Sequence, residues 1–299
     1  MNNYLSPTIR QEKEQFVRFI KNLAEKFQPK QIYCFGQITE INEKEGCFTS
    51  DTRQVKDQYF LLMVTENVTR IEHEVQEYAN NHYPCGTVTI LSHGEETIFK
   101  AINSNNRFFI TVYSTGKLLY NQSGICNPKS ELRFIPTQAA NKAQKHYDQK
   151  MLAATGFLRG ATECLAHQDY NVCTFMLHQV VEQCCIALVR VHLAYRSDIH
   201  HLGRLLRLCR AFSDRPIKTL LSGSAEDERL FNLLQKSYSD SRYGSGFSVS
   251  GTEAESLYNR VLSFVNVVKD MCLAKIEDLQ HEAMLYQELK RSEAIDIIS

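Results

Sequence analysis

The chain has 299 residues, which is enough for about two domains or one large one. Its 43% hydrophobic and 23% charged residues are typical of a soluble globular protein. The formal net charge of zero argues against broad electrostatic capture of nucleic acid but leaves room for a local basic patch. No apolar run reaches the roughly 18 residues of a membrane span, and the first residues lack the apolar core of a signal peptide.

The ten cysteines are scattered without a Cys-x-x-Cys pair, and several lie in apolar stretches. Thiols in such positions are typical of a reducing cytoplasm, where they act as small core residues. We therefore expect a cytoplasmic protein with no metal site and no contact with a membrane.

The first half alternates between β-type and helical segments up to about residue 140. Apolar residues at helical spacing predict a helix over 8–27. The sequence then predicts a strand over 31–35 that ends at Gly36, a long polar loop over 37–55, and a central strand over 58–64. The remaining predicted elements are a helix over about 67–82, a strand over 86–91, a short helix near 94–103, and the segments 107–113 and 116–120. These elements predict a domain over residues 1–135 with a small mixed β-sheet.

The second half, residues 136–299, reads as all-helical, with Pro216 its only proline after residue 140. The predicted helices cover 141–168, 170–194, a third segment that includes 201–208, 225–239, and 252 to about 280, before a charged helical tail over 284–298. Asp169 and Asp198 are the expected N-caps of the second and third helices, and Thr252 with Glu255 forms a capping-box pattern. Gly156 and Gly160 suggest close helix–helix approach.

The helix around 175–188 is apolar almost all round, yet it carries His178, Gln179 and Glu182. His178 and Glu182 are four residues apart and therefore share one face of the helix. A helix this apolar belongs inside a bundle, where polar side chains must be hydrogen-bonded, paired or used.

This pattern, an aromatic residue followed by His–Gln and then Glu, resembles the second helix of HEPN domains, in Phe175, His178, Gln179 and Glu182. HEPN domains are small all-α modules of bacterial toxin–antitoxin systems and of some nucleotide- or RNA-directed proteins. Two further segments are similar to the family: 198–202, with His200 in the His place, and 238–243, with Arg242 and Tyr243. The resemblance implies a five-helix bundle over about 141–280.

Many HEPN domains are ribonucleases that resemble one another in an arginine and a histidine with four to six residues between them. No histidine follows Arg242 at that spacing, and Arg196 with His201 has the spacing but precedes the third helix. We therefore do not expect the usual ribonuclease chemistry. Two interpretations of the polar residues remain open. In one, His178, Gln179, Glu182, His200, Arg242 and Tyr243 form a nucleotide or phosphate pocket. In the other they form a buried structural network, with Glu182 bonded to Arg242 or a histidine.

The order of elements in the first half resembles the minimal nucleotidyltransferase domain, where a Gly-Ser turn faces the triphosphate and three carboxylates hold magnesium. Gly36 matches the glycine, but Gln37 stands where serine is expected. Asp57 aligns with the first carboxylate, Tyr59 replaces the second, and the third strand offers only Thr87 and Thr89. One carboxylate does not organise two divalent cations. Asp57 is therefore a weak catalytic candidate, with a solvated strand-edge residue as the alternative.

These observations predict an α+β protein: an N-terminal degenerate nucleotidyltransferase-like small mixed β-sheet with helices, fused to a C-terminal all-α five-helix HEPN-like bundle. The expected function is binding of a nucleotide (ATP or GTP, with or without Mg²⁺) or RNA, as a homodimer through the helical half. The resemblance implies a bacterial toxin–antitoxin, stress or mobile-element setting. The alternatives are an interaction module without ligand, a divergent nucleotidyltransferase using Asp57, and a ribonuclease using Arg196 or Arg242.

Overall fold

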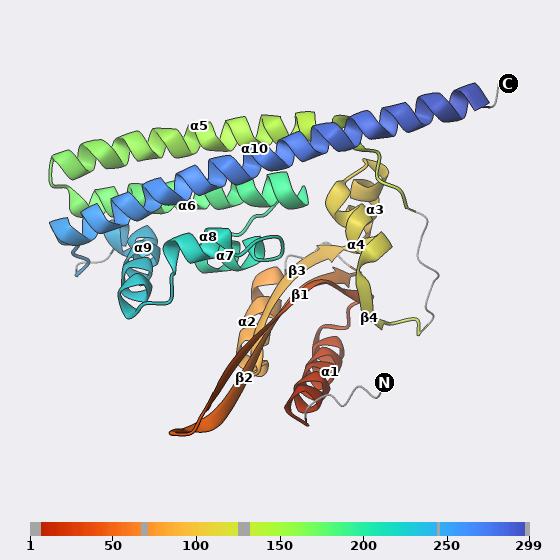
Figure 1. The fold of residues 1–299 in the computed structure, drawn as a ribbon, viewed down its shortest axis with the longest axis horizontal. Coiled ribbons are helices and arrows are strands. Elements are labelled where there is room, and N and C mark those ends of the chain that lie inside the picture. The colour runs from red at the N-terminus through yellow and green to blue at the C-terminus, as the bar shows by residue number, and fades with distance from the viewer. Residues whose placement is uncertain (1–6, 67–70, 125–131, 244–245, 297–299) are drawn as a thin grey trace. The chain divides into compact units, whose positions relative to one another are not determined.

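The computed structural model describes residues 7–66, 71–124, 132–243 and 246–296 (Figure 1). Within these ranges, side chains are described except at 7–12, 49–53, 240–243 and 294–296. The chain divides into two compact units, Met1–Phe134 and Ile135–Ser299. Each unit is described by itself.

The first unit is built on a mixed four-stranded sheet with the order β3-β2-β1-β4. Strands β1 (Gln31–Gly46) and β2 (Thr49–Thr65) pair antiparallel. Strand β3 (Gly86–Gly94) runs parallel to β2, and the short β4 (Lys117–Asn121) pairs antiparallel with β1. The predicted small mixed sheet is confirmed.

Helices cover both faces of this sheet. Helices α1 (Pro7–Phe27) and α2 (Glu72–His82) share one core with the sheet, in which Leu23, Met63 and Ile90 are fully buried. Helices α3 (Glu95–Asn103) and α4 (Arg107–Thr115) follow β3, and the Phe108 ring of α4 meets Phe35 edge-on at 5.3 Å. The helical spacing of apolar residues in α1 is what places Phe16, Phe19 and Leu23 on the buried side.

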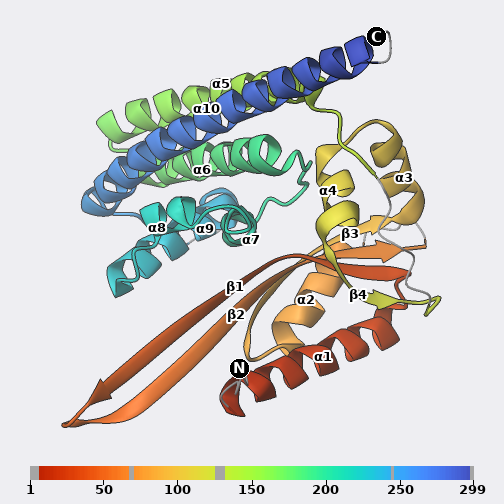
Figure 2. The same ribbon diagram turned by 45° about the vertical axis from the view of Figure 1, so that its right-hand side comes forward.

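The predicted loop over 37–55 is wrong, because β1 and β2 continue through it as a long hairpin (Figure 2). The strand does not end at Gly36: it passes a bulge between Cys34 and Gly36 and stays in register to Gly46. Residues 39–48 are exposed, so the arm has no buried face to impose an apolar alternation on the sequence. Within this arm, the residues that favour a strand are those in cross-strand pairs such as Ile41 with Val55.

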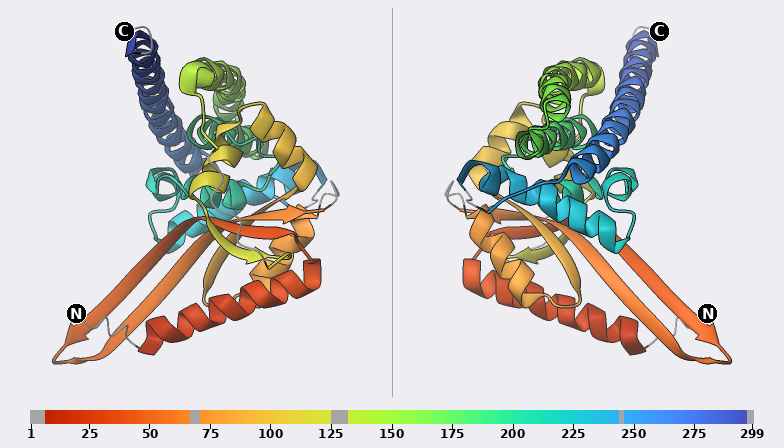
Figure 3. Two further views of the ribbon diagram at one scale, coloured as in Figure 1. Left: turned by 90° about the vertical axis from the view of Figure 1, so that its right-hand side faces the viewer. Right: turned by 90° about the vertical axis from the view of Figure 1, so that its left-hand side faces the viewer.

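The second unit is helical, with three long helices packed along one another (Figure 3). Its elements are the 3₁₀ turn η1 (Pro136–Gln138) and helices α5 (Ala139–Ala166), α6 (Tyr170–Leu193), α7 (Leu202–Cys209), α8 (Arg215–Leu220), α9 (Ala225–Tyr243) and α10 (Gly251–Asp296). Pro216 lies between two of the predicted helices and falls in the first turn of a further short helix, α8, where proline's fixed φ suits a helix start. The five expected helices are therefore six in the described part of this unit, and α10 includes most of the predicted tail.

Helix α6 lies at the centre of this unit, in contact with α5, α7, α9 and α10. By length and composition it could cross a membrane, but 67% of its apolar window is buried in the unit, as in a core helix of a soluble protein. A Cβ at Gly160 of α5 would meet the Met176 side chain of α6 at 3.6 Å, an ordinary van der Waals contact. The close helix–helix approach predicted at Gly156 is wrong, because that residue is exposed and a Cβ there would have no neighbour within 4 Å.

The helix caps differ from those predicted. His201, and not Asp198, caps α7 by accepting a hydrogen bond from Arg204 N. Asp169 is at the N-cap of α6 but makes no side-chain cap bond. The capping box of α10 is formed by Ser250 and Glu253, two residues before the Thr252 and Glu255 expected from the sequence.

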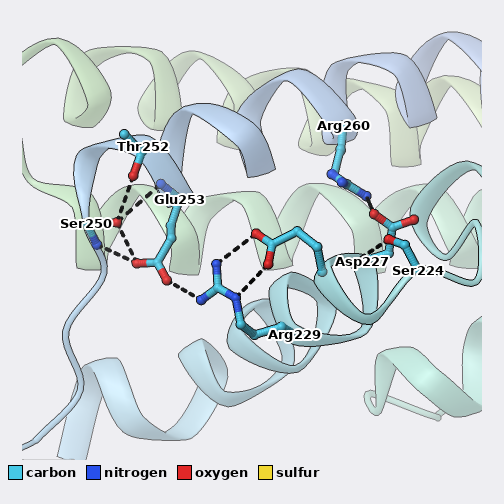
Figure 4. A network of polar contacts seen from close by, with 8 residues as sticks. Ser224, Asp227, Arg229, Ser250, Thr252, Glu253 and Arg260 are labelled. Carbon is cyan, nitrogen blue, oxygen red and sulfur yellow. Dashed lines mark hydrogen bonds and ion pairs between the residues drawn. The ribbon is translucent and has the colours of Figure 1, made fainter.

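This cap belongs to a polar network that ties α9 to α10 (Figure 4). Glu253 accepts from Ser250 N at 2.8 Å and pairs with Arg229 of α9, which also binds Glu226 at 2.8 Å. The Arg229 pairing and then the Ser250 bonds lower the pKa of Glu253 from 4.5 to about 2. About two turns farther along α10, Arg260 pairs with the buried Asp227 of α9.

The capping network makes the stability of the helical unit depend on pH. Because folding depresses the pKa of Glu253, its contribution is full above pH 4.5 and is lost as pH falls toward about 2. We expect Glu253→Gln to lower the melting temperature at pH 7, and the gap to wild type to close as pH falls through this window. Ser250→Ala removes the cap itself and costs about 1 kcal/mol, or about 2–4 °C.

Thermal unfolding followed by circular dichroism between pH 2 and pH 7 measures this difference. Glu255→Gln is the matched control, since Glu255 is exposed on the same helix. A Glu253→Gln gap that is constant across the pH range, or equal to that of Glu255→Gln, would contradict the network.

Candidate functional site

The face of α6 that carries His178 and Glu182 is buried. His178 is 2% exposed and Glu182 is 4% exposed, amid the fully buried Leu177, Val181 and Cys185. The carboxylate is therefore largely removed from water, which costs free energy unless hydrogen bonds replace the lost hydration.

His200, in the segment between α6 and α7, supplies one of those hydrogen bonds. Its Nδ1 lies 2.9 Å from Glu182 Oε1, and its side chain is 67% exposed. The other carboxylate oxygen, Oε2, is buried and has no hydrogen-bond partner among the described residues. The histidine nitrogen nearest to it is His178 Nδ1, at 3.9 Å. The structure thus brings His178, Glu182 and His200 together, and confirms that Glu182 bonds to a histidine.

His178 is held in place by its neighbours on both sides. Its ring stacks on Tyr238 of α9 with centroids 5.0 Å apart. Gln179 Nε2 lies 3.2 Å from His178 Nδ1, and an amide nitrogen can only donate, so Nδ1 is the acceptor in this contact. With Nδ1 accepting, His178 does not donate to Glu182, which agrees with the long distance between them.

Arg242 and Tyr243, the two other predicted ligand residues, lie on the last turn of α9. The helix was expected to end near Ser239 and instead continues to Tyr243. The side chains at 240–243 lie outside the described residues. Their role in the site therefore stays a prediction.

In the first unit, Asp57 is buried, which corrects the alternative of a solvated strand-edge residue. It is 7% exposed and accepts from Thr39 Oγ1 at 2.5 Å and from the Tyr59 hydroxyl at 3.0 Å. Burial first, and then the charge of Asp57, raise the pKa of Tyr59, so its hydroxyl stays protonated as a donor. Both carboxylate oxygens are therefore bonded to hydroxyl groups of the sheet.

Gly36 lies inside β1 and not at a turn. A Cβ at this position would meet the Phe60 ring at 3.0 Å, so the glycine makes room for that side chain on the neighbouring strand. Gln37 follows, and its amide donates to the Tyr59 hydroxyl at 3.3 Å. The expected backbone turn toward a triphosphate is absent from this described part of the strand, because β1 continues beyond it.

A groove of about 850 Å³ lies between α1 and the sheet, beside Gln37 and Tyr59. Its apolar walls come from α1 and β4, and among the described lining residues the cations are Lys13, Lys21 and Lys117, against one carboxylate, Glu25. The remaining lining residues are Phe16, Val17, Ile20, Ala24, Gln28, Cys34, Leu119 and Tyr120. Reasoning from the sequence missed this groove, because its walls are far apart in the chain.

Possible metal ligands do not gather anywhere in the described part of the chain: no group of three or more His, Cys, Asp or Glu side chains could hold an ion. Cys184, Cys185, Cys209 and Cys272 are buried free thiols in the second unit. Burial raises the pKa of Cys184 to about 12, so this thiol stays protonated and behaves as a small apolar residue.

Comparison with known protein families finds a match within the helical unit. Residues 149–271 match the model of the HEPN domain. The match runs from within α5 to within α10 and includes His178, Glu182 and His200. A search of curated proteins found no match to the chain.

The pairing of His200 with Glu182 is expected to stabilise the helical unit. His200→Ala leaves a buried carboxylate without its hydrogen bond, which costs about 1–3 kcal/mol. In a Glu182→Gln background the charge is already gone, so the same His200→Ala change should cost much less. Urea denaturation of the four proteins gives the coupling free energy.

His281→Ala is the control for this cycle, because His281 is an exposed histidine on α10. Additive effects of His200→Ala and Glu182→Gln would show that the two side chains do not interact in solution.

The bonding of Asp57 predicts a structural role in the first unit. Asp57→Ala leaves the Thr39 and Tyr59 hydroxyls without their acceptor, so we expect a loss of about 1–3 kcal/mol in unfolding free energy. Adding Tyr59→Phe to Asp57→Ala should recover part of this loss. Millimolar Mg²⁺ should leave the melting temperature of the wild type unchanged, and a Mg²⁺-dependent rise that needs Asp57 would contradict this role.

Proposed function

We propose that this protein binds a nucleotide or an RNA end through its HEPN domain, without acting as a nuclease or nucleotidyltransferase. The observation that carries the proposal is the pairing of a buried acid, Glu182, with an exposed histidine, His200. A carboxylate with an unbonded buried oxygen is costly to keep, and such groups gather at functional sites.

The pair presents a polar group to a ligand. Because Nδ1 of His200 donates to Glu182, Nε2 is left for a ligand. Nε2 accepts a hydrogen bond from a base edge in the neutral ring and donates to a phosphate in the protonated one. Arg242 is the predicted phosphate partner and Tyr243 the predicted stacking residue, on the resemblance of their segment to the family.

The absence of catalysis is proposed on the residues that would have to perform it. No histidine follows Arg242 at the spacing of the family's ribonucleases. In the first unit, both carboxylate oxygens of Asp57 accept hydrogen bonds, one from Thr39 and one from Tyr59. Tyr59 also stands where the nucleotidyltransferase family has its second carboxylate. A degenerate nucleotidyltransferase-like domain of this kind keeps its shape without the carboxylates that a two-metal mechanism needs.

Weak nucleotide binding in the first unit is a second candidate function, favoured by the groove beside α1. Its apolar walls suit a base, and its three lysines outnumber the carboxylate Glu25. Association as a homodimer through the helical half, a cytoplasmic location and a toxin–antitoxin-related setting complete the proposal, on the resemblance alone. The competing interpretation is an interaction module that binds a protein and no nucleotide.

Ligand-induced stabilisation tests the proposal directly. We expect ATP, GTP, AMP or a short RNA, with or without Mg²⁺, to raise the melting temperature, because a ligand at 100 times its dissociation constant stabilises by about 2.7 kcal/mol. His200→Ala and Arg242→Ala should remove the shift if the helical site binds. Lys117→Gln should remove it if the groove binds instead.

Three results would overturn the proposal. No shift with any ligand would favour the interaction module. Magnesium-dependent transfer of label from ATP that is lost in Asp57→Ala would show an active nucleotidyltransferase. RNA cleavage that survives EDTA and is lost in Arg242→Ala would show a ribonuclease.

A further inference from the structure

Basic side chains line one side of α5 near its start. Lys142, His146 and Lys150 follow one another at intervals of four residues and therefore form a stripe along the helix. Lys145 lies next to this stripe, and both Lys142 and Lys145 are exposed. Over eight residues the stripe extends about 12 Å along the helix axis.

Helix α6 adds to the same surface. Lys150 Nζ donates to Gln183 Oε1 of α6 at 3.1 Å, which fixes the two helices side by side at this point. Nearer the end of α6, Arg190 lies close enough to His146 to act on it: burial, and then Arg190, Lys145 and Lys150, lower the pKa of His146. We call Lys142, Lys145, His146, Lys150 and Arg190 the basic strip.

The charges of the basic strip are not neutralised within the unit. Among the described side chains, no carboxylate lies within 4.0 Å of its lysines or of Arg190. Asp198 raises the pKa of Arg190 from a distance greater than that of an ion pair. Burial and then Arg196 lower that pKa, and their effect is larger. The acid nearest in sequence, Asp148, is exposed and accepts a hydrogen bond from Gln144 at 2.8 Å.

One member of the strip, Lys142, also lies at the positive end of the α5 helix dipole. The first turn of this helix contains no acidic residue, and Lys142 lies at the end of that turn. A helix N-terminus carries a partial positive charge, so cations there are unfavourable. Mutual repulsion among Lys142, Lys145, Lys150 and Arg190 adds a further cost that an arriving anion would relieve.

We propose that the basic strip binds the phosphate backbone of single-stranded RNA. This inference rests on the proposed function and commits it to RNA, with backbone contacts outside the Glu182–His200 pair. A strip of several cations over about 12 Å suits successive phosphates of a strand better than the phosphate group of one nucleotide. The partly buried ring of His146 offers a surface on which an unpaired base stacks.

The salt dependence of RNA binding tests the strip. Fluorescence anisotropy with a labelled 20-nucleotide RNA of mixed sequence would be measured between 50 and 300 mM salt. For the triple variant Lys142→Gln, Lys145→Gln and Lys150→Gln we expect affinity to fall about ten-fold or more. The slope of log K against log salt should become shallower by about 2, since each lost phosphate contact contributes about 0.7 for a single strand.

Two matched variants make the result specific. Lys218→Gln, Lys236→Gln and Lys290→Gln remove the same charge elsewhere on the helical unit and should leave the slope unchanged. Replacing the three strip lysines by arginine should preserve binding, which also shows that the strip tolerates substitution. AMP-induced stabilisation should be the same in the strip variant as in the wild type.

The outcomes separate the two proposals. Wild-type protein that binds neither RNA nor nucleotide overturns the proposed function and this inference together. If the wild-type protein binds AMP but not RNA, only the proposal that the basic strip binds RNA is overturned. Equal loss of RNA binding in both lysine-to-glutamine variants also overturns the strip, as does loss of AMP binding in the strip variant.

Discussion

The burial of α6 is the constraint on which the helical unit depends. Helices α5, α7, α9 and α10 all pack against it, and residues on nearly every side of it are buried. An apolar helix needs such a surround to stay out of water. The surround in turn places a carboxylate, Glu182, where hydration cannot reach it. The structure of the unit must therefore supply hydrogen bonds or a charged partner to that buried acid.

The histidine that binds Glu182 offsets part of the free-energy cost of burying this carboxylate. Its bond satisfies one oxygen and links the interior of the unit to an exposed side chain, His200. Replacing the pair by apolar residues would relieve the desolvation cost, so stability alone does not explain why the acid is present. The proposed role in ligand binding would account for it, because the second oxygen remains unbonded in the described structure.

Sequence periodicity predicted the elements that bury one face and missed those that do not. The start of the helix Pro7–Phe27 was predicted within one residue, because the spacing of its apolar residues corresponds to a buried side. The hairpin arm of β1 and β2 was taken for a loop, since both of its faces are exposed over 39–48. The α10 cap was misplaced by two residues because Ser250 and Thr252 both fit the pattern, and only backbone geometry distinguishes them.

The candidate site was predictable in a similar way. Resemblance to HEPN domains brought out His178, Glu182 and His200, and the structure brings these three together. Asp57 was singled out by the resemblance to the minimal nucleotidyltransferase domain, but its burial could not be foreseen, because Thr39 reaches it from the other strand of the hairpin that had been taken for a loop.

The basic strip shows why net charge is a poor guide to what a surface can bind. The chain is neutral as a whole, which argued against broad capture of nucleic acid. Charge acts over about one Debye length, roughly 8 Å in physiological salt, so an anion responds to the few groups that face it and not to the sum. Individually, Lys142, Lys150 and Arg190 are ordinary residues of two different helices. The packing of α5 on α6 turns them into one continuous surface, and their unneutralised charge, in a protein otherwise balanced, is what points to a polyanion.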